Sequence, residues 1–158
     1  MNVGAFEAQS DILLFVHADM ELPSNSLPLI SKVIEQGFVG GGFVKRFDRE
    51  TTLLRLERML ANAVYLGLMK SMVGTNAIFV RKDIFKKMNG FPEVPILEDV
   101  IFSQKLKQEG LIAKITQTVI ISSRRYLKHG VVKQMIKNAL ILFKFKCLHE
   151  DPVVLKDI

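Results

Sequence analysis

Ile12-Leu13-Leu14-Phe15-Val16, followed directly by His17-Ala18-Asp19, is the stretch that decides the fold class of this 158-residue chain. Five consecutive apolar residues are too few for a core helix and are typical of a strand buried on both faces of a sheet. Polar residues directly after such a strand lie at its carboxyl end, where open α/β sheets place their ligands. The stretch therefore predicts an α/β fold with a ligand site near Asp19.

The segments on either side alternate between helical and strand patterns. The expected helices cover 2–9, about 25–36, 51–69, 82–88, 98–110 and 131–148, and the other expected strands cover 38–47, 77–80 and 112–121. Residues 91–97 and 122–130 are expected to be loops. Alternation of this kind indicates the α/β class, and several connections are too short for a purely parallel sheet. We therefore expect one domain, 1–158, with a mixed sheet flanked by helices.

Composition narrows the function classes. Hydrophobic residues make up 49% of the chain and charged residues 24%, which is enough apolar material for a core and argues against disorder. The single cysteine, Cys147, cannot form a disulfide within the chain, so a reducing compartment is expected. The net charge of +6 suits nucleic acid, anionic lipid or phosphorylated ligands. Because there is no Trp and no aromatic-basic alternation, nucleic-acid binding is not expected.

No apolar run is long enough to cross a bilayer, and the first ten residues lack the pattern of a signal peptide. The expected location is therefore the cytoplasm, with peripheral contact to the inner membrane face as a further expectation. That contact rests on the basic, apolar helix expected over 131–148, whose composition is typical of an interfacial membrane helix. The same composition also suits a helix packed on the core with its lysines extending outward.

His17 and Asp19 form the first candidate site. A carboxylate just beyond a buried strand can hold Mg²⁺ or Mn²⁺ while a diphosphate supplies most of the remaining oxygen ligands. His17 could join a manganese site but suits magnesium poorly. The alternative is structural, with Asp19 capping the next turn and His17 bonded to its neighbours, and the spacing leaves both interpretations open.

Two further groups of residues could carry chemistry. Glu98-Asp99 could supply a general base, if one carboxylate faces a cleft, or could simply be a charged helix start. Arg124-Arg125-Tyr126 could hold a pyrophosphate through bidentate bonds, or could form a solvated basic loop. Gly40-Gly41-Gly42 lacks the Gly-Lys-Ser/Thr ending of a phosphate loop, so it predicts strand flexibility or close backbone packing.

Taken together, these segments resemble glycosyltransferase family 2, which has the GT-A fold, and most of all a branch of small bacterial enzymes with His-Ala-Asp in place of Asp-x-Asp. The matching stretches occur in the family's order over nearly the whole chain. They are Met1-Asn2-Val3-Gly4-Ala5 with Ala8, 11–19 with Leu22-Pro23, Gly41-Gly42-Phe43, 74–81, Gly90-Phe91-Pro92, 95–100 and 122–126 before Gly130.

The resemblance implies a role for each candidate residue. Asp19, with His17 beside it, would bind the divalent metal that bridges the donor diphosphate. Asp99 would be the base that activates an acceptor hydroxyl, and Glu98 would orient it or contact the acceptor. Arg124, Arg125 and Tyr126 would close over the diphosphate or the acceptor. The implied reaction is sugar transfer from a nucleotide sugar to a hydroxyl acceptor, with inversion at the anomeric carbon.

The resemblance also implies that the first strand and the base-binding elements of the family precede Met1 and are missing here. Weak or no activity is then expected of this chain alone. The edge of the 12–16 strand would be bare, so pairing with another copy in a homo-oligomer is expected. The alternative is a non-catalytic oligomeric or membrane-surface interaction protein that retains a glycosyltransferase remnant.

Overall fold

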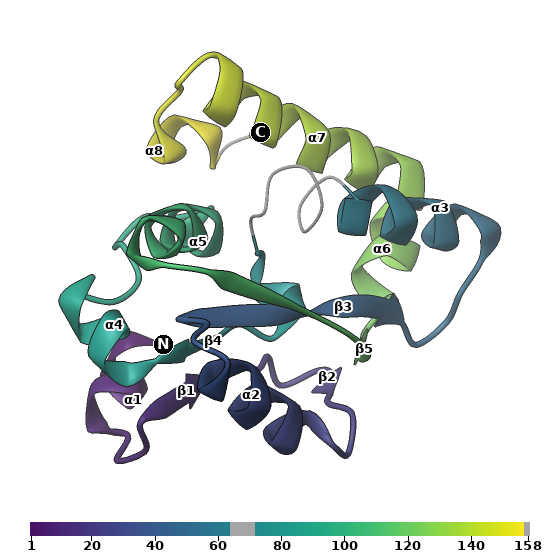
Figure 1. The fold of residues 1–158 in the computed structure, drawn as a ribbon. Helices are drawn as coiled ribbons and strands as arrows, with labels where there is room; N and C mark the ends of the chain where they lie inside the picture. Colours follow the sequence, from purple (N-terminus) through teal and green to yellow (C-terminus); the bar gives the residue numbers. More distant parts are fainter. Residues whose placement is uncertain (64–71, 157–158) are drawn as a thin grey trace.

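A mixed sheet of five strands forms the centre of the computed structural model, which describes residues 1–63 and 72–156 (Figure 1). Its strand order is β1-β4-β3-β5-β2. Strands β3 and β5 are parallel, and the other neighbouring pairs are antiparallel. The expected α/β class with a mixed sheet is therefore confirmed. The strands are β1 (Ile12–Leu14), β2 (Met20–Glu21), β3 (Gly40–Phe47), β4 (Phe79–Arg81) and β5 (Ile112–Ile121).

Helices flank this sheet, with α5 and α7 above it and α2 below it in the view of Figure 1. The expected helices are present to within two residues, except that residues 64–69 of the longest expected helix, 51–69, lie outside the described part. The helices are α1 (Asn2–Glu7), α2 (Ser26–Glu35), α3 (Thr52–Ala61), α4 (Lys82–Lys87), α5 (Glu98–Glu109), α6 (Arg124–His129), α7 (Val131–Cys147) and α8 (Pro152–Leu155), with the short 3₁₀ helix η2 (Gly74–Asn76) before β4.

The sheet separates two clusters of buried apolar side chains. Neighbouring residues at β4 point to opposite faces, so Phe79 belongs to one cluster and Ile78 and Val80 to the other. The second of these clusters includes a group of phenylalanines in which the rings of Phe91 and Phe102 stack at 4.2 Å between centroids. This packing anchors the first turns of α5, where the candidate acids Glu98 and Asp99 lie.

The triple glycine of β3 is explained by close approach of neighbouring backbones. A Cβ atom on Gly41 would lie 2.4 Å from the carbonyl oxygen of Ala113, and one on Gly40 would lie 2.6 Å from that of Phe79. Such distances are far below van der Waals contact. Of the two interpretations drawn from the sequence, close backbone packing is the one that the structure confirms.

Two sequence predictions are wrong. Residues 12–16 are not buried on both faces: β1 covers only 12–14 at the edge of the sheet, Leu13 is its one buried residue, and Val16 is 42% exposed. An edge strand has one neighbour instead of two, so its outer side stays open.

Residues 122–130 are not a loop, because 124–129 form helix α6. This helix buries none of its residues, so its sequence has no apolar periodicity that would predict it. The two-residue strand β2 and the short helix α8 were not predicted.

Candidate active site

A cavity of about 550 Å³ collects most of the residues that the sequence singled out. Its walls come from the loop after β1, the first turn of α5, α6 and α7. Five of the seven candidate residues line it, namely His17, Asp19, Asp99, Arg125 and Tyr126. Segments around positions 19, 99 and 125 thus contribute acidic and basic groups to one hollow.

The other two candidate residues lie apart from this cavity. Glu98 lines a neighbouring cavity of about 460 Å³, formed with α1 and β1, and His17 and Asp99 line both. Arg124 is exposed on α6 and is not among the residues lining either cavity. Glu98 and Asp99 therefore share the 460 Å³ cavity, and only Asp99 also lines the larger one. Of the two adjacent arginines, only Arg125 lines the larger cavity.

Asp99 has the environment expected of a general base. Its carboxylate accepts hydrogen bonds from the backbone N–H groups of Gly74 and Val100, the latter at 2.7 Å. Burial raises the pKa of Asp99, the Gly74 hydrogen bond opposes this, and the charge of Glu98 raises the pKa further. A carboxyl whose pKa is shifted upward toward neutrality is a better proton acceptor at physiological pH than an ordinary aspartate.

Gly74 is a site residue whose role is visible only in the structure. A Cβ atom there would lie 2.5 Å from Nε2 of His17 and 3.4 Å from Oδ2 of Asp99. Its backbone also donates to the Asp99 carboxylate. The absence of a side chain therefore lets the imidazole and the carboxylate approach the same backbone segment. In the sequence, Gly74 is only the first residue of the matching stretch 74–81, and nothing there indicates its contact with His17 and Asp99.

The residues near Asp19 suit a metal ion that takes most of its coordinating oxygens from a bound diphosphate and from water. His17 and Asp19 are both exposed, and within 1–63 and 72–156 no three His, Cys, Asp or Glu side chains are grouped to hold a metal ion. Mg²⁺ commonly takes one or two protein carboxylates and completes its shell with water and phosphate oxygens. Asp19 can supply the one carboxylate of that mode, and His17 near it suits Mn²⁺ better than Mg²⁺.

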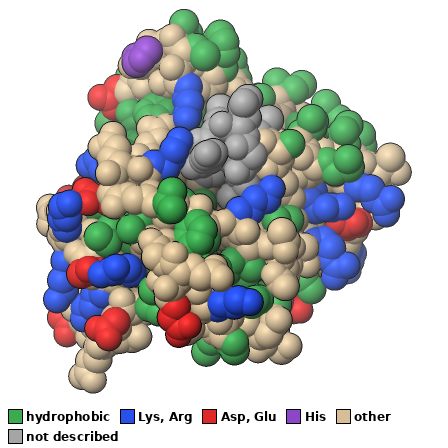
Figure 2. Space-filling model, in the orientation of Figure 1, with side chains coloured by type: hydrophobic (Ala, Val, Ile, Leu, Met, Phe, Trp, Pro, Cys, Tyr) green, Lys and Arg blue, Asp and Glu red, His purple; other side chains and the backbone are tan. Residues whose placement is uncertain are grey.

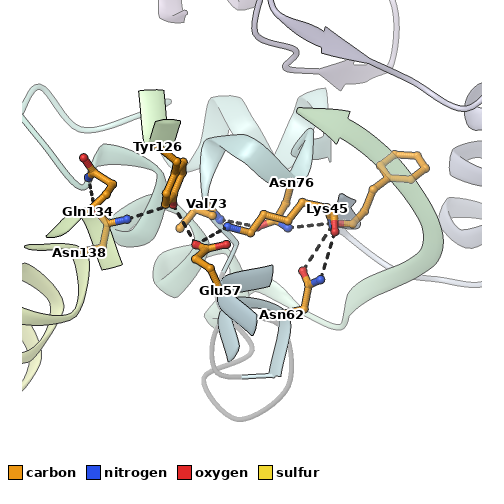
Figure 3. A network of polar contacts seen from close by, with 9 residues as sticks. Lys45, Glu57, Asn62, Val73, Asn76, Tyr126, Gln134 and Asn138 are labelled. Carbon is orange, nitrogen blue, oxygen red and sulfur yellow. Dashed lines mark hydrogen bonds and ion pairs between the residues drawn. The ribbon is translucent and has the colours of Figure 1, made fainter. Parts of the chain in front are cut away.

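A buried polar network, which sequence reasoning missed, supports one wall of the cavity (Figure 3). Lys45 on β3 and Glu57 on α3 form an ion pair at 3.0 Å, and both side chains are more than nine-tenths buried. The hydroxyl of Tyr126 donates to Oε1 of Glu57 at 2.9 Å and accepts from the Asn138 amide at 3.2 Å. Asn138 in turn accepts from Gln134 at 2.8 Å. The network therefore joins β3, α3, α6 and α7.

This network and a second contact set the position of α6. The Tyr126 ring packs edge-on against Phe47, with centroids 5.1 Å apart. At the start of α6, the backbone N–H of Ser123 donates to Oδ1 of Asp48 at 2.8 Å. Hydrogen bonding from the Ser123 side chain, and next from its backbone, lowers the pKa of Asp48. Both contacts tie α6 to the end of β3, so Arg125 is held at the mouth of the cavity by residues far from it in sequence.

The pKa shifts of Asp99 and Asp48 predict opposite effects of pH on stability. The raised pKa of Asp99 means that its contribution is full below its ordinary pKa of 3.8 and is lost as pH rises through the folded-state value. The lowered pKa of Asp48 means that its contribution is present above 3.8 and is lost as pH falls through the folded-state value.

Urea unfolding of Asp99→Asn, Asp48→Asn and the unsubstituted chain between about pH 3 and pH 8 checks this prediction. As pH rises, the unfolding free energy of the unsubstituted chain is expected to fall relative to Asp99→Asn and to rise relative to Asp48→Asn. A pH-independent difference for Asp99→Asn would contradict the buried environment assigned to this carboxyl.

The fold and cavity together define an α/β protein with a mixed sheet and a hollow lined by acidic and basic side chains at one end of that sheet. Comparison with protein-family models, curated proteins and solved structures gave no match. In the described part of the chain, no helix has both the length and the apolar character that crossing a membrane requires.

Proposed function

We propose that this chain is a glycosyltransferase of the GT-A type, transferring a sugar from a nucleotide sugar to a hydroxyl acceptor with inversion. The observation that supports this most is that Asp19, Asp99 and Arg125 line one cavity. Inverting transfer of this kind needs a carboxylate that holds the metal at the donor diphosphate, a base near the acceptor hydroxyl and positive charge at the leaving group. The three side chains supply these functions from three different elements.

In the proposed reaction, the acceptor hydroxyl loses its proton to Asp99 as its oxygen bonds to the anomeric carbon. The bond between that carbon and the diphosphate oxygen breaks from the opposite face, and the nucleoside diphosphate leaves with the bonding electrons. Asp19 and His17 would hold a divalent metal, which supplies charge neutralisation at the diphosphate when bound. The raised pKa of Asp99 suits the proton transfer.

Arg125 and Tyr126 contribute to the same cavity from α6. The guanidinium of Arg125 would pair with the diphosphate oxygens, and Lys137 on α7 adds a second positive charge to the same wall. Tyr126, which is tied to Glu57, holds the α6 wall in place. Glu98, which lines the 460 Å³ cavity with Asp99, would orient Asp99 or contact the acceptor. Arg124, exposed on α6, would close over the diphosphate or the acceptor.

Calorimetry with Mn²⁺ and inorganic pyrophosphate, UDP, GDP, CDP and dTDP tests this function. Because the charged residues of the cavity suit the diphosphate, we expect pyrophosphate and the nucleotides to bind with similar affinity, and only with metal. Asp19→Asn and Arg125→Gln are each expected to weaken binding about tenfold or more, the worth of one hydrogen bond to a charged group.

Asp83→Asn is the matched control, because Asp83 is an exposed carboxylate paired with Arg81 and is not among the residues lining this cavity. It is expected to leave binding unchanged. Binding that persists without Mn²⁺, or that neither Asp19→Asn nor Arg125→Gln affects, would remove the basis for the proposed metal and diphosphate site.

A second candidate function is a non-catalytic protein that works as an oligomer or at a membrane surface. Within the described residues, β1 pairs only with β4, so one edge of the sheet is open to a strand from another copy. Open edges of this kind favour pairing between chains. This candidate is compatible with the same fold, and failure of every nucleotide and pyrophosphate to bind would favour it.

A further inference from the structure

Helices α3 and α7 expose apolar side chains side by side on one face of the molecule. In α7, four apolar residues are exposed on a single stripe at 3.6 residues per turn, and Leu142 is the only apolar side chain of this helix that is buried. In α3, three exposed leucines form a second stripe. The stripes consist of Val132, Ile136, Leu140 and Phe143 on α7 and of Leu53, Leu56 and Leu60 on α3.

A groove of about 340 Å³ lies between the two helices. Its lining is almost entirely apolar and includes Leu60 and Phe143 from the two stripes. Figure 2 shows hydrophobic side chains gathered over this part of the molecule, where Figure 1 places α3 and α7. Monomeric soluble proteins rarely leave a contiguous apolar surface of this kind uncovered, and such surfaces mark docking sites for membranes or proteins.

Lysines border the α7 stripe on both sides. By helical periodicity, Lys133, Lys137 and Lys144 lie along one side of it and Lys146 lies along the other. The helix contains no acidic residue between Val131 and Cys147. An apolar stripe with lysines on both sides, here three on one side and one on the other, is the arrangement by which a helix rests in a membrane surface. Its apolar side chains then lie among the acyl chains and its ammonium groups at the phosphates.

We propose that the α3–α7 face, defined by these seven apolar residues and the lysines beside them, docks on a membrane surface that carries anionic phospholipids. A second copy of this chain is a poorer occupant, because a symmetric contact would bring like-charged lysines together. Docking would also place the 550 Å³ cavity beside the membrane, since Glu57, Asn138 and Leu142 line both that cavity and the groove. The proposal does not depend on sugar transfer.

Flotation with vesicles of phosphatidylcholine, with and without ~30 mol% phosphatidylglycerol, tests the proposal. Lys144 is paired with Glu150 at 3.2 Å, which leaves Lys133, Lys137 and Lys146 to contact the phosphates. Three such lysines predict an affinity on the order of 100-fold higher for the anionic vesicles, and this difference is expected to shrink as salt is added. Lys133→Gln combined with Lys146→Gln is expected to reduce binding to the anionic vesicles at least tenfold.

Glutamate substitutions of exposed apolar residues, on the α3–α7 face and elsewhere, test whether this face in particular binds the vesicles. Ile136 and Phe143 are 63% and 55% exposed, so Ile136→Glu and Phe143→Glu are expected to fold normally and to abolish flotation. Leu111→Glu is the control, because Leu111 is 68% exposed in the turn between α5 and β5, away from this face. It is expected to float like the unsubstituted chain. Circular dichroism checks that each variant is folded.

A second measurement uses Cys147, the single cysteine, which is exposed and lines the groove. A polarity-sensitive fluorophore attached there is expected to shift to shorter wavelength with anionic vesicles and not with neutral ones. The proposal is overturned if the chain floats with neither vesicle, or if Phe143→Glu floats as well as Leu111→Glu. It is also overturned if light scattering reveals a dimer that Ile136→Glu dissociates while no vesicle binding occurs.

Discussion

Replacing Glu57 with glutamine is expected to lower the free energy of unfolding by about 3 to 5 kcal/mol. The carboxylate pairs with Lys45 at 3.0 Å in a place where both side chains are almost fully buried. Burial lowers the pKa of Lys45, and the charge of Glu57 opposes that shift. Removing the negative charge leaves a buried ammonium group without compensation and also weakens the bond from Tyr126. Urea unfolding at neutral pH measures the loss.

The double variant Lys45→Met/Glu57→Leu is the informative control. Buried ion pairs replaced as a pair by apolar residues of similar size often cost little or nothing, because the desolvation penalty of both charges disappears. We therefore expect the double variant to recover most of the stability that Glu57→Gln loses. Conversely, a loss below about 1 kcal/mol for Glu57→Gln would mean that solvent reaches the pair, contrary to its observed burial.

Relative to the weak transfer expected of this chain alone, replacing Asp99 with asparagine is expected to lower sugar transfer by about 10²- to 10⁴-fold, the usual contribution of a general base. Asparagine keeps the size and an acceptor oxygen for the Gly74 N–H, yet it cannot take a proton from the acceptor hydroxyl. Release of nucleoside diphosphate from a panel of nucleotide sugars, measured with Mn²⁺ and hydroxyl acceptors, checks this.

The loss should fall on the chemical step and spare the binding of pyrophosphate with Mn²⁺. Asp83→Asn, whose carboxylate is exposed and paired with Arg81, should transfer at the unsubstituted rate. If Asp99→Asn retains full transfer activity while Asp19→Asn does not, the general base that accepts the proton is a residue other than Asp99. Thermal unfolding of each variant distinguishes a lost base from a lost fold.

Much of the fold follows from local sequence pattern. The apolar run at 12–16, the helical spacing over 51–61 and the turn at Asn89-Gly90 each point to an element that the structure contains. Asn89 and Gly90 have positive φ values of 59° and 73°, and Asn and Gly are the residues that adopt this conformation most readily. Patterns of this kind act over a few residues and are visible without tertiary contacts.

Elements whose existence depends on distant partners were predicted poorly. Strand β2 consists of two residues paired with the end of β5, about a hundred residues later in the chain. Helix α6 buries none of its residues and depends on Asp48 and Glu57 for its position. Neither has a periodic pattern of its own, so local sequence could not indicate them.

The candidate site, like the fold, has features that the sequence indicated and features that only the packing of the elements determines. The residue types near positions 19, 99 and 125 were enough to nominate acids and a cation, because carboxylates after a strand or at a helix start are recognisable from sequence. Their grouping around one cavity, the exclusion of Arg124 and Glu98 from it, and the buried Lys45–Glu57 pair depend on how β3, α5 and α6 pack.

Sequence by itself determined the α/β class, the order of most elements and the nature of the candidate groups, since these depend on local periodicity and residue chemistry. Only the tertiary structure decided which of those groups share a cavity, which carboxyl has a raised pKa and which apolar residues of α7 stay exposed. The reason is that burial and charge interactions act over a few ångströms in space, between residues that the chain separates by tens of positions.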